Sequence, residues 1–164
     1  TKWCELRNAQ PGYDNVLSWL NAVSDTLLYV QAFCSLAEAA GYGTCYLGTT
    51  LYNPQGIIDL LKLPKLTFPV ATITVGVPDE CPEQPDRLPH LAYIHEETYQ
   101  DYTPNQLDII YYLKEQLEEN QKFVEVNKKE NLAQVFTDCR YTKTDNEAMS
   151  EGLLAALKAQ GFLR

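Results

Sequence analysis

The stretch from residue 41 to residue 89 most constrains the fold, because glycines and prolines divide it into short, distinct segments. Residues 44–47 are apolar and lie between two glycines, which predicts a buried strand that ends in an open turn. Residues 53–63 read as a helix that opens on Asn-Pro, and residues 70–75 alternate as a second strand. A strand, a helix and a strand in this spacing predict a βαβ unit with parallel pairing.

A long helix is predicted before this stretch, from residue 12 to residue 40, and Gly41 stands where a helix C-cap favours glycine. Apolar residues recur along it at helical spacing: Val16, Leu20, Val23, Leu27, Val30, Cys34 and Ala37. Further apolar residues widen this stripe beyond one face. We therefore expect a central helix that is buried on several sides, and in a chain this short such a helix favours dimerisation.

After this stretch the sequence predicts one further strand and three helices. Residues 78–89 contain four prolines and cannot form a helix or a central strand. Residues 91–95 are predicted as a strand, residues 103–126 as one helix that opens on a capping box, and residues 130–137 as a short helix. A second capping box at residues 144–147 predicts a last helix to residue 160, with Gly161 and Phe162 closing its end.

Composition indicates a single globular domain of 164 residues and excludes several partners. The net charge of −9 argues against nucleic acid or an anionic membrane surface as the main partner. No apolar run approaches the roughly 20 residues of a membrane span. The five cysteines are scattered and odd in number, which predicts a reduced, cytoplasmic protein with free thiols.

Local motifs exclude three kinds of catalytic or cofactor site. His95-Glu96-Glu97 resembles the start of a zinc-protease motif, but Tyr99 stands where the second histidine is needed, so no metal site is predicted. The serines lack the G-x-S-x-G setting of a serine hydrolase. The glycines of residues 41–48 flank a strand instead of joining a strand to a helix, which excludes a Rossmann fingerprint.

Two features could bind a ligand, and for each the sequence leaves a simpler alternative open. Arg87 is a single cation in an acidic loop, which suits bidentate binding of a phosphate. It could equally form a salt bridge with a nearby carboxylate: Asp79, Glu80, Glu83 or Asp86. The turn at Leu47-Gly48-Thr49 could offer backbone groups to a flat ligand, or be an ordinary tight turn.

Taken together, these segments resemble the nitroreductase family, and most closely its oxygen-insensitive NADPH nitroreductases and flavin reductases. The resemblance extends from Asp25 to Tyr99 and rests on the order and spacing of several pieces. They are Asp25…Gln31…Ala37-Glu38, Gly41-Tyr42-Gly43, Tyr46-Leu47-Gly48, Leu60-Leu61-Lys62-Leu63-Pro64, Phe68-Pro69-Val70, Val75-Gly76-Val77-Pro78, Arg87-Leu88-Pro89 and His95-Glu96…Tyr99.

The resemblance implies an α+β fold with helices around a mixed β-sheet, a homodimer, and FMN bound at the dimer interface. It implies that NAD(P)H reduces the flavin, which then reduces a nitro compound, a quinone or a second flavin. The family's flavin-facing turn matches Tyr46, Leu47, Gly48 and Thr49, and its phosphate-binding arginine matches Arg87. Pro85 stands where the family has a lysine. No residue is predicted to be a catalytic acid or base, because the flavin carries the chemistry.

The beginning of the chain differs from the family pattern. Family members carry an Arg-Ser-x-Arg cluster that binds FMN ahead of the long helix, and this sequence begins at Thr1 without it. The chain therefore resembles the C-terminal two-thirds of a nitroreductase. An alternative from another class is a non-catalytic, truncated paralogue that dimerises without flavin and serves as an interaction or binding module.

Overall fold

The computed structural model describes residues 1–163 and divides the chain into two compact units. The first unit contains residues 1–80 together with the C-terminal residues from 146 onward, and the second contains residues 81–145. The chain passes between the units twice, after residue 80 and within the first turn of the last helix. We describe each unit by itself.

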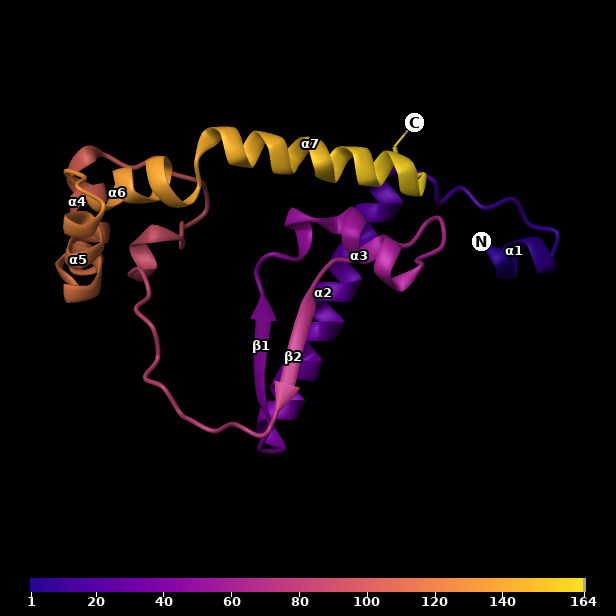
Figure 1. Cartoon of the computed structure of the whole chain (residues 1–164), viewed down its shortest axis with the longest axis horizontal. Helices are drawn as coiled ribbons and strands as arrows, with labels where there is room; N and C mark the ends of the chain where they lie inside the picture. Colours follow the sequence, from indigo (N-terminus) through magenta and orange to yellow (C-terminus); the bar gives the residue numbers. More distant parts are fainter. Residues whose placement is uncertain (164) are drawn as a thin grey trace. The chain divides into compact units, whose positions relative to one another are not determined.

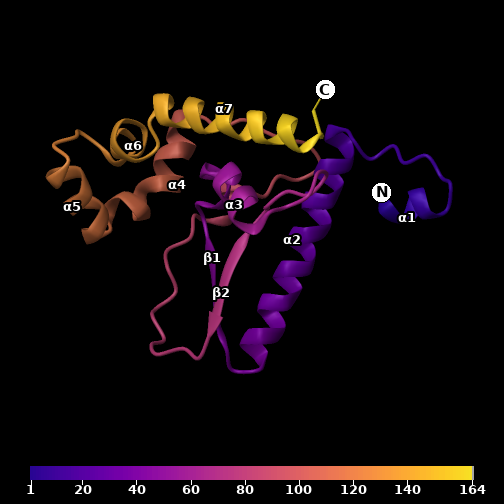
Figure 2. The ribbon, with the colours of Figure 1, turned by 45° about the vertical axis from the view of Figure 1, so that its right-hand side comes forward.

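The first unit is built on one long helix and a pair of strands that lie along it (Figure 1 and Figure 2). Helix α2 (Val16–Ala39) starts where the Asn15 side chain accepts a hydrogen bond from the Ser18 N–H at 2.9 Å. Strand β1 (Gly43–Leu47) follows directly, and its Thr44 hydroxyl donates to Glu38 of α2 at 2.7 Å. This bond ties the first strand to the end of the helix.

The parallel pairing predicted for the two strands is wrong. Strand β1 pairs with β2 (Thr72–Gly76) in antiparallel register, from Gly43 opposite Gly76 to Leu47 opposite Thr72. The connection between them therefore leaves and returns at the same end of the sheet, and helix α3 (Pro54–Leu61) does not cross over to the far end. Apolar periodicity predicts where strands form but contains no information about their relative direction.

Helix α2 is much more exposed in this chain than its apolar composition predicts. Among its residues only Cys34 is buried. Leu28 and Leu36 are 72% and 71% exposed, and other large apolar side chains of α2 are also open: Val16, Leu17, Leu20, Leu27, Tyr29 and Phe33. The two-stranded sheet lies along only part of the helix surface. The remaining apolar faces have no cover within the described chain.

The end of the last helix, α7 (Lys143–Gln160), forms much of the core of the first unit. Gly161 has φ +92°, and its N–H and that of Phe162 donate to the last turn of α7, as predicted for a glycine C-cap. The buried Gln160 side chain donates to the carbonyls of Pro64 and Thr67 at 3.1 and 2.9 Å. The chain beyond α3 is thereby fixed to the end of α7.

The second unit contains three helices and no strand among its residues. Helix α4 (Pro104–Gln116) begins with the predicted capping box of Thr103 and Gln106. The single helix predicted here instead breaks at Leu117, and α5 (Glu118–Val126) continues beyond the break. Helix α6 (Leu132–Val135) is followed by a π-helical turn, η3 (Phe136–Arg140).

Two further predictions of local structure are corrected. Residues 91–95 form no strand, because the N–H groups of residues 92–94 bond to carbonyls of residues 89 and 90 around the 3₁₀ turn η2 (His90–Ala92). The last helix starts at Lys143, where the Thr142 hydroxyl accepts from the Asp145 N–H at 3.2 Å, so its cap lies two positions before the predicted cap, Thr144. The first residues form a short helix, α1 (Lys2–Leu6).

The described fold is mostly helical with one small antiparallel sheet, which confirms the predicted α+β class. All five cysteines are free thiols. Among the described residues, none of the helices has the length and hydropathy needed to cross a membrane.

Candidate functional site

The turn predicted to face a flat ligand follows directly from strand β1. Residues 46–49 are all exposed, and they lead into the 3₁₀ turn η1 (Thr50–Tyr52). A side chain placed at Gly48 would meet no atom within 4 Å. The backbone at this position is therefore open to a ligand that approaches the strand end.

Thr50 holds this turn in place, although sequence reasoning did not select it. Its buried hydroxyl donates to the Leu47 carbonyl at 3.2 Å and lies 2.9 Å from the Thr72 hydroxyl, with which it forms a second hydrogen bond. Because Leu47 and Thr72 are paired across the two strands, one hydroxyl joins the turn to both. The signal in the sequence is a threonine just after a strand, which favours such side-chain to backbone bonds.

Tyr46 lies 42% exposed at the start of the turn, and its hydroxyl interacts with the buried thiol of Cys34. Partial desolvation, followed by the hydrogen bond to Cys34, raises the pKa of Tyr46 above its ordinary value of 10.0. The phenol is therefore neutral at neutral pH. Tyr46 therefore offers no negative charge to a ligand.

Arg87 belongs to the second unit, in an exposed loop without regular structure. Its Nη1 donates to the carbonyls of Pro85 and Asp86 at 3.1 and 3.0 Å. Within residues 1–163 its guanidinium forms no ion pair with a carboxylate. The salt bridge that the sequence left open is therefore not formed there.

The carboxylate beside Arg87 is paired with a different cation. Lys114, in the last turn of α4, places its Nζ 2.8 Å from Asp86 Oδ2. Both side chains are partly shielded, at 26% and 28% exposure. Sequence reasoning did not select Lys114, because 27 residues separate it from Arg87 and no local pattern connects them.

His95, the histidine of the incomplete zinc motif, is part of an aromatic cluster. Its Nδ1 accepts from the Gln100 N–H at 3.4 Å, and its Nε2 lies 3.3 Å from the Tyr102 hydroxyl. That hydroxyl donates to the Ala92 carbonyl at 2.9 Å, so Nε2–H is the matching tautomer. The Tyr99 ring lies 4.7 Å from the imidazole between centroids. These contacts account for the histidine as a structural residue.

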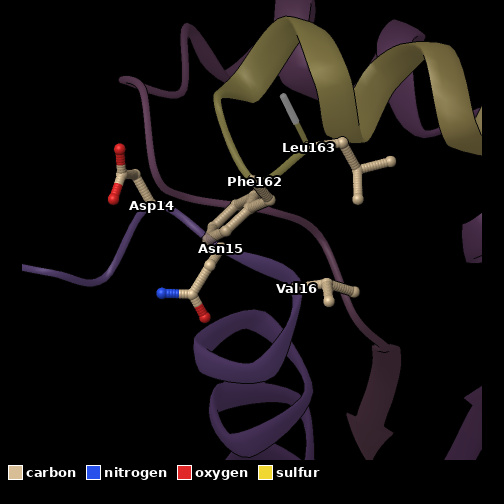
Figure 3. A pocket seen from close by; sticks show the side chains of 5 residues that line it. All are labelled: Asp14, Asn15, Val16, Phe162 and Leu163. Carbon is tan, nitrogen blue, oxygen red and sulfur yellow. The ribbon is translucent and has the colours of Figure 1, made fainter.

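A hollow of about 420 Å³ lies in the first unit, where the chain after α7 meets the start of α2 (Figure 3). Its lining residues are Asp14, Asn15, Val16, Phe162 and Leu163. The Asn15 amide already donates to the Gly12 carbonyl and its oxygen caps α2. None of the residues predicted for ligand binding lines this hollow.

Comparisons with known proteins place these features in a family. The model of the nitroreductase family matches residues 7–77, which contain α2, both strands and the turn at residues 46–49. A Cr(VI) reductase of Pseudomonas sp. (strain G-1) is 40% identical over 86 residues, which is 52% of this chain and 35% of the relative. An FMN reductase [NAD(P)H] of Bacillus subtilis (strain 168) is 43% identical over 63 residues, which is 38% of this chain and 25% of the relative.

A crystal structure of a protein from Bacteroides fragilis NCTC 9343 superimposes on this chain with a TM-score of 0.96 and 60% sequence identity. The superposition covers 99% of this chain and 66% of that protein. The matched regions are about a third or less of each of the two curated relatives. The predicted resemblance to the nitroreductase family is confirmed for residues 7–77, the part of the chain that the family model matches.

Proposed function

We propose that the protein acts as an FMN-dependent NAD(P)H oxidoreductase that reduces nitro compounds, quinones or flavins. The observation that carries the proposal is the open turn at residues 46–49, inside the segment that matches the nitroreductase model. A relative that is 43% identical over 63 residues is named an FMN reductase [NAD(P)H]. We propose the cytoplasm as its location.

The residues present fit the chemistry of FMN. The isoalloxazine ring is flat and needs a close approach, which Gly48 allows because no side chain projects from it. The phosphate is a dianion, for which a guanidinium with unused N–H groups is a suitable donor. We therefore propose that Tyr46, Leu47, Gly48 and Thr49 contact the flavin ring and that Arg87 binds the phosphate.

Bound FMN supplies the hydride chemistry, with NAD(P)H as the electron donor. The chain's own residues bind the cofactor and orient it. Thr50 keeps the turn in position through its hydrogen bonds to Leu47 and Thr72. We propose no catalytic acid or base.

The exposed apolar residues of α2 support the proposal of a homodimer. The same exposure suits the alternative function, a non-catalytic module that dimerises without flavin. Flavin binding distinguishes the two proposals, because only the oxidoreductase needs it.

The test is to add FMN to the purified chain, remove unbound flavin, and record the absorbance spectrum. We expect flavin bands to stay with the protein and to bleach on anaerobic addition of NADPH. A colourless protein after this treatment contradicts the oxidoreductase and favours the module.

The role of Arg87 is tested by the Arg87→Ala variant. We expect FMN binding to weaken by about 1.5–3 kcal/mol, as for a lost hydrogen bond to a charged group. Flavin fluorescence quenching measures the affinity, and Arg7→Ala is the control, since Arg7 is an exposed arginine in the first unit. Equal affinity of Arg87→Ala and the unaltered chain removes Arg87 from the proposed site.

A further inference from the structure

The carboxylate of the adjacent residue, Asp86, can compete with a phosphate for the guanidinium of Arg87. A phosphate-binding guanidinium works only if it is not already neutralised, and a carboxylate beside it also repels the incoming dianion. The structure shows how this conflict is avoided. The Asp86 carboxylate faces Lys114 at 2.8 Å, while Arg87 bonds only to two backbone carbonyls among the described residues.

The backbone of Lys114 is held in place, which lets its side chain pair with Asp86. It lies at the end of α4, where its carbonyl accepts from the Asn120 side chain at 2.8 Å and from the Leu117 N–H at 3.3 Å. Asn120 is only 6% exposed, so this cap is part of the packed unit. The break between α4 and α5 thereby anchors the backbone from which the Lys114 ammonium reaches Asp86.

The guanidinium of Arg87 is positioned from its own loop. Both of its hydrogen bonds come from Nη1, and they go to Pro85 and Asp86. Within residues 1–163, Nε and Nη2 donate to no protein atom and remain available to an anion. Asp86, Arg87 and Lys114 together carry one net positive charge, whereas Asp86 and Arg87 without Lys114 would carry none.

We propose that Lys114 is a positioning residue for phosphate recognition: it neutralises Asp86 and so keeps Arg87 available for the phosphate of FMN. This inference rests on the proposed function of Arg87. It assigns Lys114 no contact with the ligand. Its effect is therefore confined to ligands that carry the phosphate.

The experiment measures the dissociation constants of the full chain for FMN and for riboflavin, which lacks the phosphate, by fluorescence quenching. In Lys114→Met the freed carboxylate competes for Arg87 and repels the phosphate. We expect FMN to bind about threefold to tenfold more weakly, consistent with one charge interaction near a protein surface. Riboflavin binding should stay unchanged.

Two further variants isolate the mechanism. Asp86→Asn combined with Lys114→Met removes the competing carboxylate, and we expect it to restore FMN affinity to within about twofold of the unaltered chain. Lys122→Met is the matched control, because Lys122 is an exposed lysine of α5 in the same unit with no ion pair among the described residues. It removes the same net charge and should leave both affinities unchanged.

The possible outcomes separate this inference from the function on which it rests. If Arg87→Ala keeps the preference for FMN over riboflavin, or if the unaltered chain binds neither, the proposed function fails and the inference fails with it. If Arg87→Ala loses that preference while Lys114→Met matches Lys122→Met, only the inference is overturned. If the double variant stays as weak as Lys114→Met, Lys114 acts on the phosphate directly and the neutralising role is wrong.

Discussion

Single polar side chains hold two local structures of this protein in place. The turn at the end of β1 depends on the hydroxyl of Thr50, and the loop of Arg87 depends on the pair of Asp86 with Lys114. Both contacts join residues that the sequence separates by more than 20 positions, as in the bond from Thr50 to Thr72. Such partners are not visible in local sequence.

Replacing Thr50 by valine tests whether the hydrogen bonds of its hydroxyl stabilise the turn. Valine keeps the shape but removes a buried donor, and we expect the free energy of unfolding to fall by about 1–2 kcal/mol. Urea denaturation measures the change. Thr49→Val is the control, because Thr49 is exposed and should change stability by less than about 0.5 kcal/mol. Similar stabilities for the two variants would show that the Thr50 hydroxyl does not stabilise the fold.

Asp138 provides a prediction about pH. Its carboxylate accepts from Lys129 at 2.9 Å and from the Thr137 hydroxyl at 2.9 Å, and these bonds lower its pKa below the ordinary value of 3.8. The folded state thus favours the ionised form. The stabilisation is complete above pH 3.8 and is lost as the pH falls through the lowered pKa.

We therefore expect Asp138→Asn to lower the melting temperature at pH 7, and the difference from the unaltered chain to shrink in acid. Thermal unfolding followed by circular dichroism across the acid range measures it. Asp108→Asn serves as the control, because no ion pair to Asp108 is seen within residues 1–163. A difference that stays constant down to the lowest pH would contradict the role of the charge.

At the scale of elements, the sequence predicted where helices and strands form better than how they end or pair. Helix α2, helix α3, both strands and the capping box at Thr103 follow from apolar periodicity and cap residues, which are local signals. The antiparallel register depends on the path of the connection, which is not local. For the site, the turn and Arg87 could be chosen from residue type, but Thr50 and Lys114 could not.

The break between α4 and α5 is a second feature that local sequence signals do not reveal. Residues 103–126 carry one continuous helical pattern, yet Leu117 adopts extended dihedral angles of −61° and 130°. Asn120 compensates by donating to the Lys114 carbonyl at 2.8 Å, which would otherwise accept only the longer bond from the Leu117 N–H at 3.3 Å. A buried amide three residues beyond the break is a tertiary feature that periodicity does not reveal.

Replacing Asn120 by alanine tests whether this amide stabilises the break. We expect a loss of about 1–2 kcal/mol in unfolding free energy, because the partly buried Lys114 carbonyl loses the closer of its two donors. Denaturant unfolding of Asn120→Ala and of Asn105→Ala measures the effect, since Asn105 is exposed in the same helix pair. An equal loss of unfolding free energy in both variants would mean that another group caps α4.

For the whole molecule, the main feature is the apolar surface of α2. A helix with this composition is stable when its faces are covered, and in the described chain most of its large apolar side chains are open. The chain also spans only part of the proteins it matches, with 66% coverage of the Bacteroides fragilis protein. The proposed homodimer would cover part of this surface.

Leu28→Glu and Leu36→Glu test that proposal. Both side chains are more than two-thirds exposed in the single chain, so a glutamate should not disturb its fold, but it would place an unpaired charge in an interface. We expect the unaltered chain to sediment as a dimer at micromolar concentration and these variants to shift towards monomer. Asn21→Glu adds the same charge at an exposed polar position of α2. A monomeric unaltered chain contradicts the proposed dimer.

The central claim is that the turn at residues 46–49 and the side chain of Arg87 both contact one FMN. A nuclear magnetic resonance titration of the isotope-labelled chain with FMN tests it at both places at once. We expect the amide signals of residues 46–49 and the side-chain signal of Arg87 to shift along the same binding curve, and riboflavin to shift only the first group. Shifts confined to other residues, or two groups that respond with different affinities, would contradict the claim.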